Sequence, residues 1–439
     1  MFRQTSFYQM LLLAVPIGLI VGLAVIVYFA IIYLGTAGIW EALPSLIGIS
    51  HARENPWYIL VMTTIGGLLV GLCTHFFRSY EEVDILKEMN EEGRVDIQKV
   101  PGTLVGAFVS LVMAGSVGPE ASLMDMGAGI GTFIANRLKH ATERARVVTF
   151  TAFSAVFGGF FSPPFGSALL ALELPHVQNL AYYGLLFPCI IATVMTYGLF
   201  VVFFGGTLGG GYTFPAYQGF RFVHLIYAIP LGIIGTLAGI IFIYLFRELH
   251  YLMRPLASRP VLKGFIGGLG FGLIAMKLPL TLFSGDHELQ TLLNTGLHMG
   301  IGALLLLGLA KIVTTCLCLS TGFIGGRIFP TFFVGGAIGM AVYLLFPVMP
   351  LTVCILCVMA ATAVCVLKAP ISIVLLVTAL IQPGLAPVMS IAVIVSFVLT
   401  ADIPLMPESK AEQRSFLLSL FSHLTISKQR KQEGRSGGD

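Results

Sequence analysis

Apolar segments long enough to cross a lipid bilayer recur along nearly the whole of this chain. A transmembrane helix needs roughly 20 mostly apolar residues, and short polar stretches separate segments of this kind here. Only 10% of the 439 residues are charged and 56% are hydrophobic, which excludes an ordinary soluble domain. The sequence therefore predicts an all-α, polytopic membrane protein. We expect spanning helices at 9–35, 57–77, 101–116, 144–160, 180–205, 223–246, 262–280, 297–319, 331–347, 350–367 and 383–400.

Three further apolar segments are too short or too interrupted to cross a membrane alone: 118–136, 163–174 and 369–381. Broken helices of this kind are common in transporters and channels, whose sites lie near the middle of the bilayer. The first span is longer than a signal-peptide core and lacks a cleavage site, so we expect it to be a retained helix.

Basic residues indicate how the chain is oriented. The segment 428–435 and the loop 137–146 are basic, and the loop 78–99 carries basic residues among many acids. Basic loops tend to stay on the cytoplasmic side, so we expect both termini in the cytoplasm. We expect residues 1–406 to form a transmembrane, ion-conducting domain and residues 407–439 to form a cytoplasmic tail.

The most informative interruption is Gly322-Phe-Ile-Gly-Gly-Arg-Ile-Phe-Pro330, a glycine-rich break before a new helix. In lipid, bare backbone polar groups are tolerated only where they are buried in protein or line a polar cavity. The first N–H groups of the new helix have no partner within it, and they lie at the positive end of the helix dipole. The break is therefore either a candidate anion site or a packing kink.

The same layout occurs earlier in the chain, which predicts an internal repeat. Gly115-Ser-Val-Gly-Pro119 resembles the later break, and Pro330 follows Pro119 by 211 residues. A second pair, Pro164 and Pro370, is 206 residues apart. Glycine-proline breaks at corresponding places point to a midplane site, although small-residue motifs also recur simply because they pack helices. Spacing leaves open whether the repeats are parallel or inverted. We place them at about 57–205 and about 262–400.

Ionisable residues inside apolar segments are costly and are functional candidates by default. Glu120 follows the first break and lies in the first turn of a helix, where a carboxylate favours the dipole. It is either a gate for permeation or a cap of that helix. Glu173 closes the helix that begins at Pro164, so it is either a carboxylate at a helix end or part of a proton or ion relay.

Three other ionisable residues are candidates of the same kind. Asp125 projects differently from Glu120, and we expect it to form a buried pair with a serine or an amide. Arg327 either attracts anions by its charge or points away and leaves only its backbone N–H at the site. Lys368 either adds positive potential to the pore or extends to a membrane interface.

Enzymatic chemistry has little support in this sequence. It contains no nucleophile elbow, no paired histidines at metal spacing and no Walker-type phosphate loop. Cys354 and Cys357 have redox spacing, but they lie in an apolar helix where cysteine behaves as a small hydrophobe. We therefore expect no enzyme activity, no metal, no cofactor and no nucleic-acid partner.

Four motifs in series resemble the CLC family of chloride channels and proton-coupled chloride antiporters. Gly115-Ser-Val-Gly-Pro119 resembles its G-(K/R)-E-G-P signature, and Gly325-Gly-Arg-Ile-Phe-Pro330 resembles its G-G-x-F-x-P signature. The segment from Pro164 to Glu173 resembles the helix that leads to its inner glutamate. Ala369-Pro-Ile-Ser-Ile-Val-Leu-Leu376 resembles its R-A-P-L-T-G-I-V-L element, with Lys368 in the basic position. The match runs over roughly residues 55–406.

The resemblance implies two inverted repeats of tilted, broken helices in each subunit. It also implies a homodimer in membrane lipid with one pore per subunit, of the kind found in bacterial inner membranes. The permeant ligand would be chloride or another small anion. The anion site would be made by the backbone amides of Arg327, Ile328 and Phe329 on one side. Val117 and Gly118 would supply the amides of the other side.

Departures from the family pattern affect the positions that couple anions to protons. The external gating glutamate falls on Val117, and the inner proton-transfer glutamate falls on Leu174. The tyrosine that closes the inner side, and so contributes to anion binding, falls on Met406. The family's first signature, G-S-G-I-P, is replaced by the acidic segment 80–88, which leaves its serine ligand without a counterpart.

These departures predict a CLC-type anion conductor that is channel-like, with weak or no proton coupling. One alternative is an antiporter in which Glu120 replaces the lost external glutamate. A second alternative is a secondary transporter of another solute, in which the acids bind a cation. The permeant anion and the gating stimulus stay open at this stage.

Overall fold

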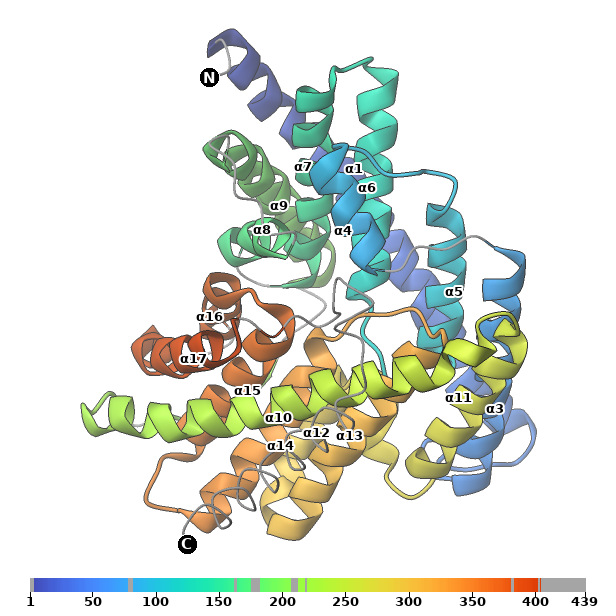
Figure 1. The fold of residues 1–439 in the computed structure, drawn as a ribbon, viewed down its shortest axis with the longest axis vertical. Coiled ribbons are helices and arrows are strands. Elements are labelled where there is room, and N and C mark those ends of the chain that lie inside the picture. Colours follow the sequence, from blue (N-terminus) through green and yellow to red (C-terminus); the bar gives the residue numbers. More distant parts are fainter. Residues whose placement is uncertain are drawn as a thin grey trace, which may run out of the picture.

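A computed structural model describes residues 4–77, 82–161, 164–174, 182–206, 212–217, 219–379, 383–401 and 403 (Figure 1). The predicted Met406 and the tail 407–439 lie outside these residues. Within them the chain is built of helices, and the predicted all-α polytopic membrane fold is confirmed. Among the described residues, six helical segments are long and apolar enough to cross a bilayer: 7–46, 56–76, 183–204, 223–256, 301–321 and 328–345.

The first half of the chain contains one very long helix followed by shorter ones. α1 continues through a π-helical turn (Gly38–Ala42) into the short α2. The helices of this half are α1 (Gln4–Ala37), α2 (Leu43–Leu46), α3 (Pro56–Phe76), α4 (Glu82–Glu91), α5 (Val100–Val112), α6 (Glu120–Arg137), α7 (Thr142–Phe160), α8 (Pro164–Glu173) and α9 (Tyr182–Phe204).

The second half repeats this order of helices. It contains α10 (Val223–Met253), α11 (Pro260–Ala275), α12 (Asp286–Thr295), α13 (Ile301–Thr321), α14 (Ile328–Leu345), α15 (Leu351–Leu367), α16 (Pro370–Ala379) and α17 (Ala386–Thr400). Each helix from α11 to α17 begins 201 to 209 residues after its counterpart among α3 to α9. The bounds of the two series lie close to the predicted repeats, and the short helices α4 and α12 are additions that the apolar pattern does not reveal.

Equivalent helices of the two halves run antiparallel where they meet. α3 and α11 lie side by side at the right of Figure 1. Gly67 of α3 packs on the backbone of Gly264 and Gly268, whereas Gly71, one turn later, packs on Pro260. Because the contacts move backward along α11 as they move forward along α3, the two helices have opposite directions. An inverted repeat places equivalent helices in this relation.

The core lies around the two helices that follow the glycine breaks. α14 packs on α15, and α6 packs on α7, so that each break helix is covered by its successor. α15 is buried from Thr352 to Leu367, as expected for a helix that is hydrophobic on all sides. Burial on every side positions the first turns of α6 and α14 deep in the protein.

The glycines at the α3–α11 crossing are required by the distance between the two backbones. A Cβ atom at Gly67 would overlap the carbonyl oxygen of Gly264. Gly67→Ala should therefore lower the free energy of unfolding by about 2 kcal/mol through overpacking. Gly198→Ala is the matched control, because a Cβ there meets no described atom within 4 Å. Thermal unfolding in detergent measures both; equal melting temperatures would show that the crossing adjusts without cost.

Candidate functional site

Two helix N-termini from opposite halves of the chain meet in the interior. Gly118 and Gly326 form an antiparallel bridge, in which the Gly118 N–H donates to the Gly326 carbonyl at 2.9 Å and the reverse bond is 2.6 Å. α6 begins two residues after Gly118, and α14 begins two residues after Gly326. The positive ends of two helix dipoles therefore point at one buried place, which favours a negative charge there.

The Glu120 side chain places a carboxylate at this point. Its Oε1 atom accepts a hydrogen bond of 3.1 Å from the backbone N–H of Phe329, in the first turn of α14. Glu120 is only 1% exposed. A Cβ atom on either Gly118 or Gly326 would overlap the Glu120 carboxylate, so the group lies directly against both glycines. The carboxylate thus occupies the position in which a helix N-terminus binds an anion.

The predicted amide ligands divide into two groups in this arrangement. The Val117 N–H donates to the Gly115 carbonyl at 2.8 Å, and the Gly118 N–H is used in the bridge. Among the later residues, Phe329 directs its N–H at the Glu120 carboxylate, next to Ile328 at the start of α14. That these amides bind a permeant anion stays a prediction.

The Val117 side chain fills space rather than carrying charge. It is fully buried and packs against Gly325, where an added Cβ would overlap the valine Cγ2 atom. The residue before it, Ser116, contacts the hydroxyls of Thr314 and Thr315 on α13, both at 3.1 Å. The Ser110 hydroxyl accepts the N–H of Ile324 at 2.9 Å. These bonds tie each break to the helices of the opposite half.

An aromatic cluster surrounds the Phe329 ring. The Phe329 ring is stacked on Phe161 at 5.7 Å and meets Phe160 edge-on at 5.0 Å. Phe332, one turn along α14, adds a third ring at 6.1 Å. Packed rings exclude water, and low water content strengthens the electrostatic interactions of the neighbouring carboxylate.

Lys311 is a buried cation that the sequence interpretation missed. It lies on α13, is 0% exposed, and donates from Nζ to the carbonyls of Thr281, Leu282 and Phe283 at 3.1, 3.1 and 2.8 Å. These three acceptors match the three protons of an ammonium group. The sequence does contain a signal for Lys311, because it is an ionisable residue inside an apolar segment, and such residues are functional candidates by default.

A group of polar side chains at the N-terminus of α12 lies next to Lys311. The Tyr212 hydroxyl donates to Asp286 Oδ1 at 2.5 Å, and Glu288 accepts the N–H of Gly285 at 3.1 Å. Burial raises the pKa of Tyr212 well above its ordinary value, and the negative charges of Asp286 and Glu120 add to this rise. Burial also raises the pKa of Glu288, which the positive charge of Lys311 partly offsets.

Glu173 and Lys368 bind the ends of helices other than α6 and α14. The Glu173 carboxylate accepts the N–H groups of Ile371 and Ser372 at 3.1 and 2.8 Å, which caps the start of α16 across the two halves. Lys368 ends α15 in a left-handed conformation, and its Nζ donates to the Thr400 carbonyl at the end of α17. Their predicted roles in a proton path and in pore electrostatics stay predictions.

The remaining predicted residues occupy three different positions. Arg327 is the half-buried N-cap residue of α14. Asp125 is buried on α6, and its predicted serine or amide partner stays a prediction. Leu174 follows Glu173 and is nearly buried, with a hydrocarbon side chain that has no proton to exchange. The structure therefore brings Glu120, Gly118 and Phe329 together, and it places Glu173 and Lys368 elsewhere.

The comparisons with known proteins agree with one another. The family model described as "Voltage gated chloride channel" matches residues 66–401. Among curated relatives, "Putative ion-transport protein YfeO" of Escherichia fergusonii is 25% identical over 416 residues, covering 92% of this chain and 97% of the relative. The protein of the same name from Salmonella paratyphi A is 26% identical over 414 residues, covering 92% and 98%.

Solved structures show the same fold. A slow cyanobacterial Cl⁻/H⁺ antiporter superimposes with a TM-score of 0.75 and 22% identity, covering 90% of this chain and 96% of that one. A CLC-type fluoride/proton antiporter has a TM-score of 0.71 and 18% identity, covering 93% and 99%. At these identities the likeness concerns the arrangement of helices.

Lys311 should contribute strongly to stability because it satisfies three carbonyl groups at once. Lys311→Met leaves those oxygens buried without their donor, and we expect the free energy of unfolding to fall by about 3 kcal/mol. Lys277→Met, at an exposed position in the loop after α11, is the control and should change it by less than about 0.5 kcal/mol. Urea unfolding in detergent micelles gives both values; similar stabilities for the two variants would contradict this role of Lys311.

Proposed function

Because the chain belongs to the voltage-gated chloride channel family, we propose that it carries small anions across a bacterial inner membrane through the site between α6 and α14. The observation that carries the proposal is the Glu120 carboxylate, which accepts the Phe329 N–H at the junction of two helix N-termini. A place that stabilises a tethered carboxylate also stabilises a free anion of similar charge. Backbone dipoles bind such an anion without holding it too tightly to leave.

In this proposal Glu120 is the gate. Its carboxylate and the permeant anion compete for the same N–H group, so the anion enters when the carboxylate leaves or gains a proton. The family's gating position is Val117, which has no charge to move, whereas Glu120 is three residues later and reaches the same junction. The helix starts at Glu120, so its side chain projects back toward the N-terminal break.

We propose that conduction is channel-like, with weak or no proton coupling. Coupling requires a titratable group that passes protons between the site and the opposite face of the membrane. Leu174 is a hydrocarbon at the family's inner position, and the adjacent Glu173 carboxylate is held by two amides of α16. Both oxygens of that carboxylate are therefore already engaged at the start of α16, instead of facing the path between the site and the opposite face.

Proton-coupled antiport is the second candidate, and the position of Glu120 is the observation that favours it. A carboxylate that exchanges with the anion and takes up a proton satisfies half of the requirement for coupling. The structural relatives named Cl⁻/H⁺ and fluoride/proton antiporters share the fold within which such exchange occurs. In this case Glu120 serves both as gate and as external proton acceptor.

We also propose a homodimer with one pore in each subunit and both termini in the cytoplasm. Exposed apolar side chains on the short helices α8 and α16, such as Phe165 and Ile371, support a lipid-buried contact with a second copy. α8 and α16 contact each other, and α8 is drawn above α16 at the left of Figure 1.

Removing the Glu120 carboxylate should open the path. Glu120→Ala should raise anion flux about tenfold at neutral pH, because a charge-assisted hydrogen bond worth about 1.5 kcal/mol or more no longer competes with the anion. Glu120→Gln should remove the acceleration by low pH that we expect of the natural protein. Chloride, fluoride and nitrate efflux from liposomes is the measurement, with Glu143→Gln at an exposed site as control. Wild-type flux and wild-type pH dependence in both variants would exclude Glu120 as the gate.

A proton-pumping assay separates the two candidates. In liposomes with an outward chloride gradient and no proton gradient, a channel-like protein should move chloride without driving protons uphill. Stoichiometric uphill proton movement that Glu120→Gln abolishes would establish antiport instead. The control is the same assay with a protonophore, which shows that a pH change inside the vesicles is detectable.

A further inference from the structure

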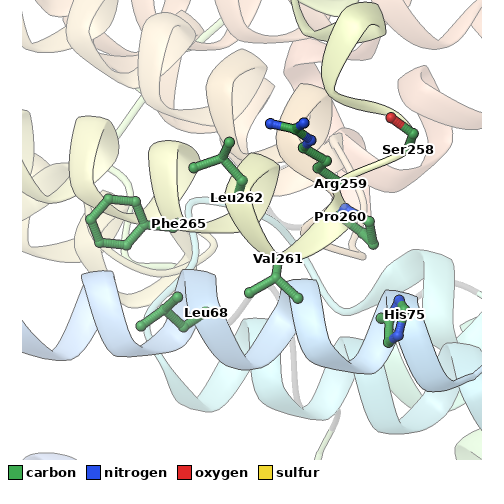
Figure 2. Close-up of a pocket in the computed structure, with 8 residues that line it drawn as sticks. All are labelled: Leu68, His75, Ser258, Arg259, Pro260, Val261, Leu262 and Phe265. Carbon is green, nitrogen blue, oxygen red and sulfur yellow. The ribbon is translucent and has the colours of Figure 1, made fainter.

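A groove separate from the anion site opens where α3 ends and α11 begins (Figure 2). It encloses a volume of about 450 Å³. His75, Ser258 and Arg259 lie at its polar end, and Leu68, Leu262 and Phe265 form an apolar wall. In Figure 2, Arg259 and His75 flank the start of α11 from two sides, and the three apolar side chains extend away from them along the two helices.

The polar end lies in basic surroundings. Arg259 is exposed and holds the N-cap position of α11, although its side chain does not cap that helix. Arg254, in the same turn of chain between α10 and α11, is also exposed, with its guanidinium 5.7 Å from the Tyr251 ring. An excess of basic residues at one end of a membrane helix is typical of the cytoplasmic side. The cytoplasmic leaflet carries the anionic lipids.

The apolar wall decides between a lipid and a soluble anion. Leu262 is 40% exposed at the outer surface of a helix in a membrane protein, and Leu68 of α3 lines the same groove. A free phosphate gains nothing from these side chains, whereas an acyl chain buries apolar area against them. The basic polar end and the apolar wall of the groove together match a molecule with an anionic head and a hydrocarbon tail.

We propose that this groove binds an anionic phospholipid, with its phosphate between Arg259 and His75 and an acyl chain along Leu68, Leu262 and Phe265. The two helices that form the groove also pack on the end of α13. Thr74, next to His75, lies against Gly322, and a Cβ on Gly267 of α11 would overlap the Thr321 side chain. The bound lipid thus braces the point at which the break of the anion site begins.

The effect of the lipid on conduction rests on the function proposed above, whereas its binding does not. Binding is therefore measured directly, by native mass spectrometry of the detergent-solubilised full chain with added phosphatidylglycerol, phosphatidylcholine or inorganic phosphate. We expect phosphatidylglycerol to bind more tightly than phosphatidylcholine. Arg259→Gln should weaken phosphatidylglycerol about fivefold, as expected for about 1 kcal/mol from one basic residue near the headgroups.

Two further variants keep the test decisive. Leu262→Trp fills the apolar wall at an exposed position and should displace the lipid while the chain stays folded. Lys277→Gln removes an exposed charge beyond the opposite end of α11 and should leave lipid binding unchanged. Melting temperatures within 2 °C of the natural protein establish that each variant is folded.

Three results would overturn the proposal. Equal binding of the two lipids, with no effect of Arg259→Gln, would make the groove ordinary lipid-covered surface. Displacement of phosphatidylglycerol by millimolar inorganic phosphate would assign the site to a soluble anion. Equal losses in Arg259→Gln and Lys277→Gln would indicate a general charge effect. Anion flux in vesicles with and without phosphatidylglycerol then tests regulation separately, because a chain that conducts no anion can still bind the lipid.

Discussion

The backbone bridge between Gly118 and Gly326 is the contact on which the rest of the site depends. Each of two helices is interrupted inside the protein, and each interruption leaves N–H and C=O groups that lipid cannot satisfy. Gly118 in one break and Gly326 in the other satisfy each other's N–H and C=O groups through reciprocal hydrogen bonds of 2.9 and 2.6 Å. Glycine is needed at both places because the Glu120 carboxylate lies where a Cβ atom would be. The bridge thereby fixes two helix N-termini around one buried acid.

Charges elsewhere in the protein follow the same logic of helix ends. Glu173 caps α16 from the other half of the chain, and Lys368 binds the Thr400 carbonyl at the end of α17. Lys311 satisfies three carbonyl groups in the chain before α12. Each of these residues is an ionisable group in an apolar segment, and each binds backbone groups at a helix end or in a turn, where a helix leaves them without a partner. A charged group in an apolar segment can therefore serve the end of a helix, whether or not an anion passes there.

Much of the fold follows from residue patterns alone. Apolar length predicts the long helices, because a bilayer leaves few other ways to satisfy a backbone, and the structure confirms an all-α membrane fold. The paired prolines predict the correspondence between α6 and α14 and between α8 and α16. Apolar length does not predict α4 and α12, because these helices are short and polar on one face. Lys311 was overlooked in the sequence, although its type and position already marked it.

The sequence by itself determined the membrane class, the two-part order of helices and the place of the glycine breaks, because hydrophobic length and glycine-proline spacing are local properties. Only the tertiary structure decided what Glu120 touches. Its partner, the Phe329 N–H, lies 209 residues away in the chain, and nothing in either segment specifies that the two helix starts face each other. The same holds for Glu173, whose two amide partners lie 198 and 199 residues away. A sequence pattern shows that a charged residue lies in an apolar segment, whereas the packing of distant helices decides which backbone groups it binds.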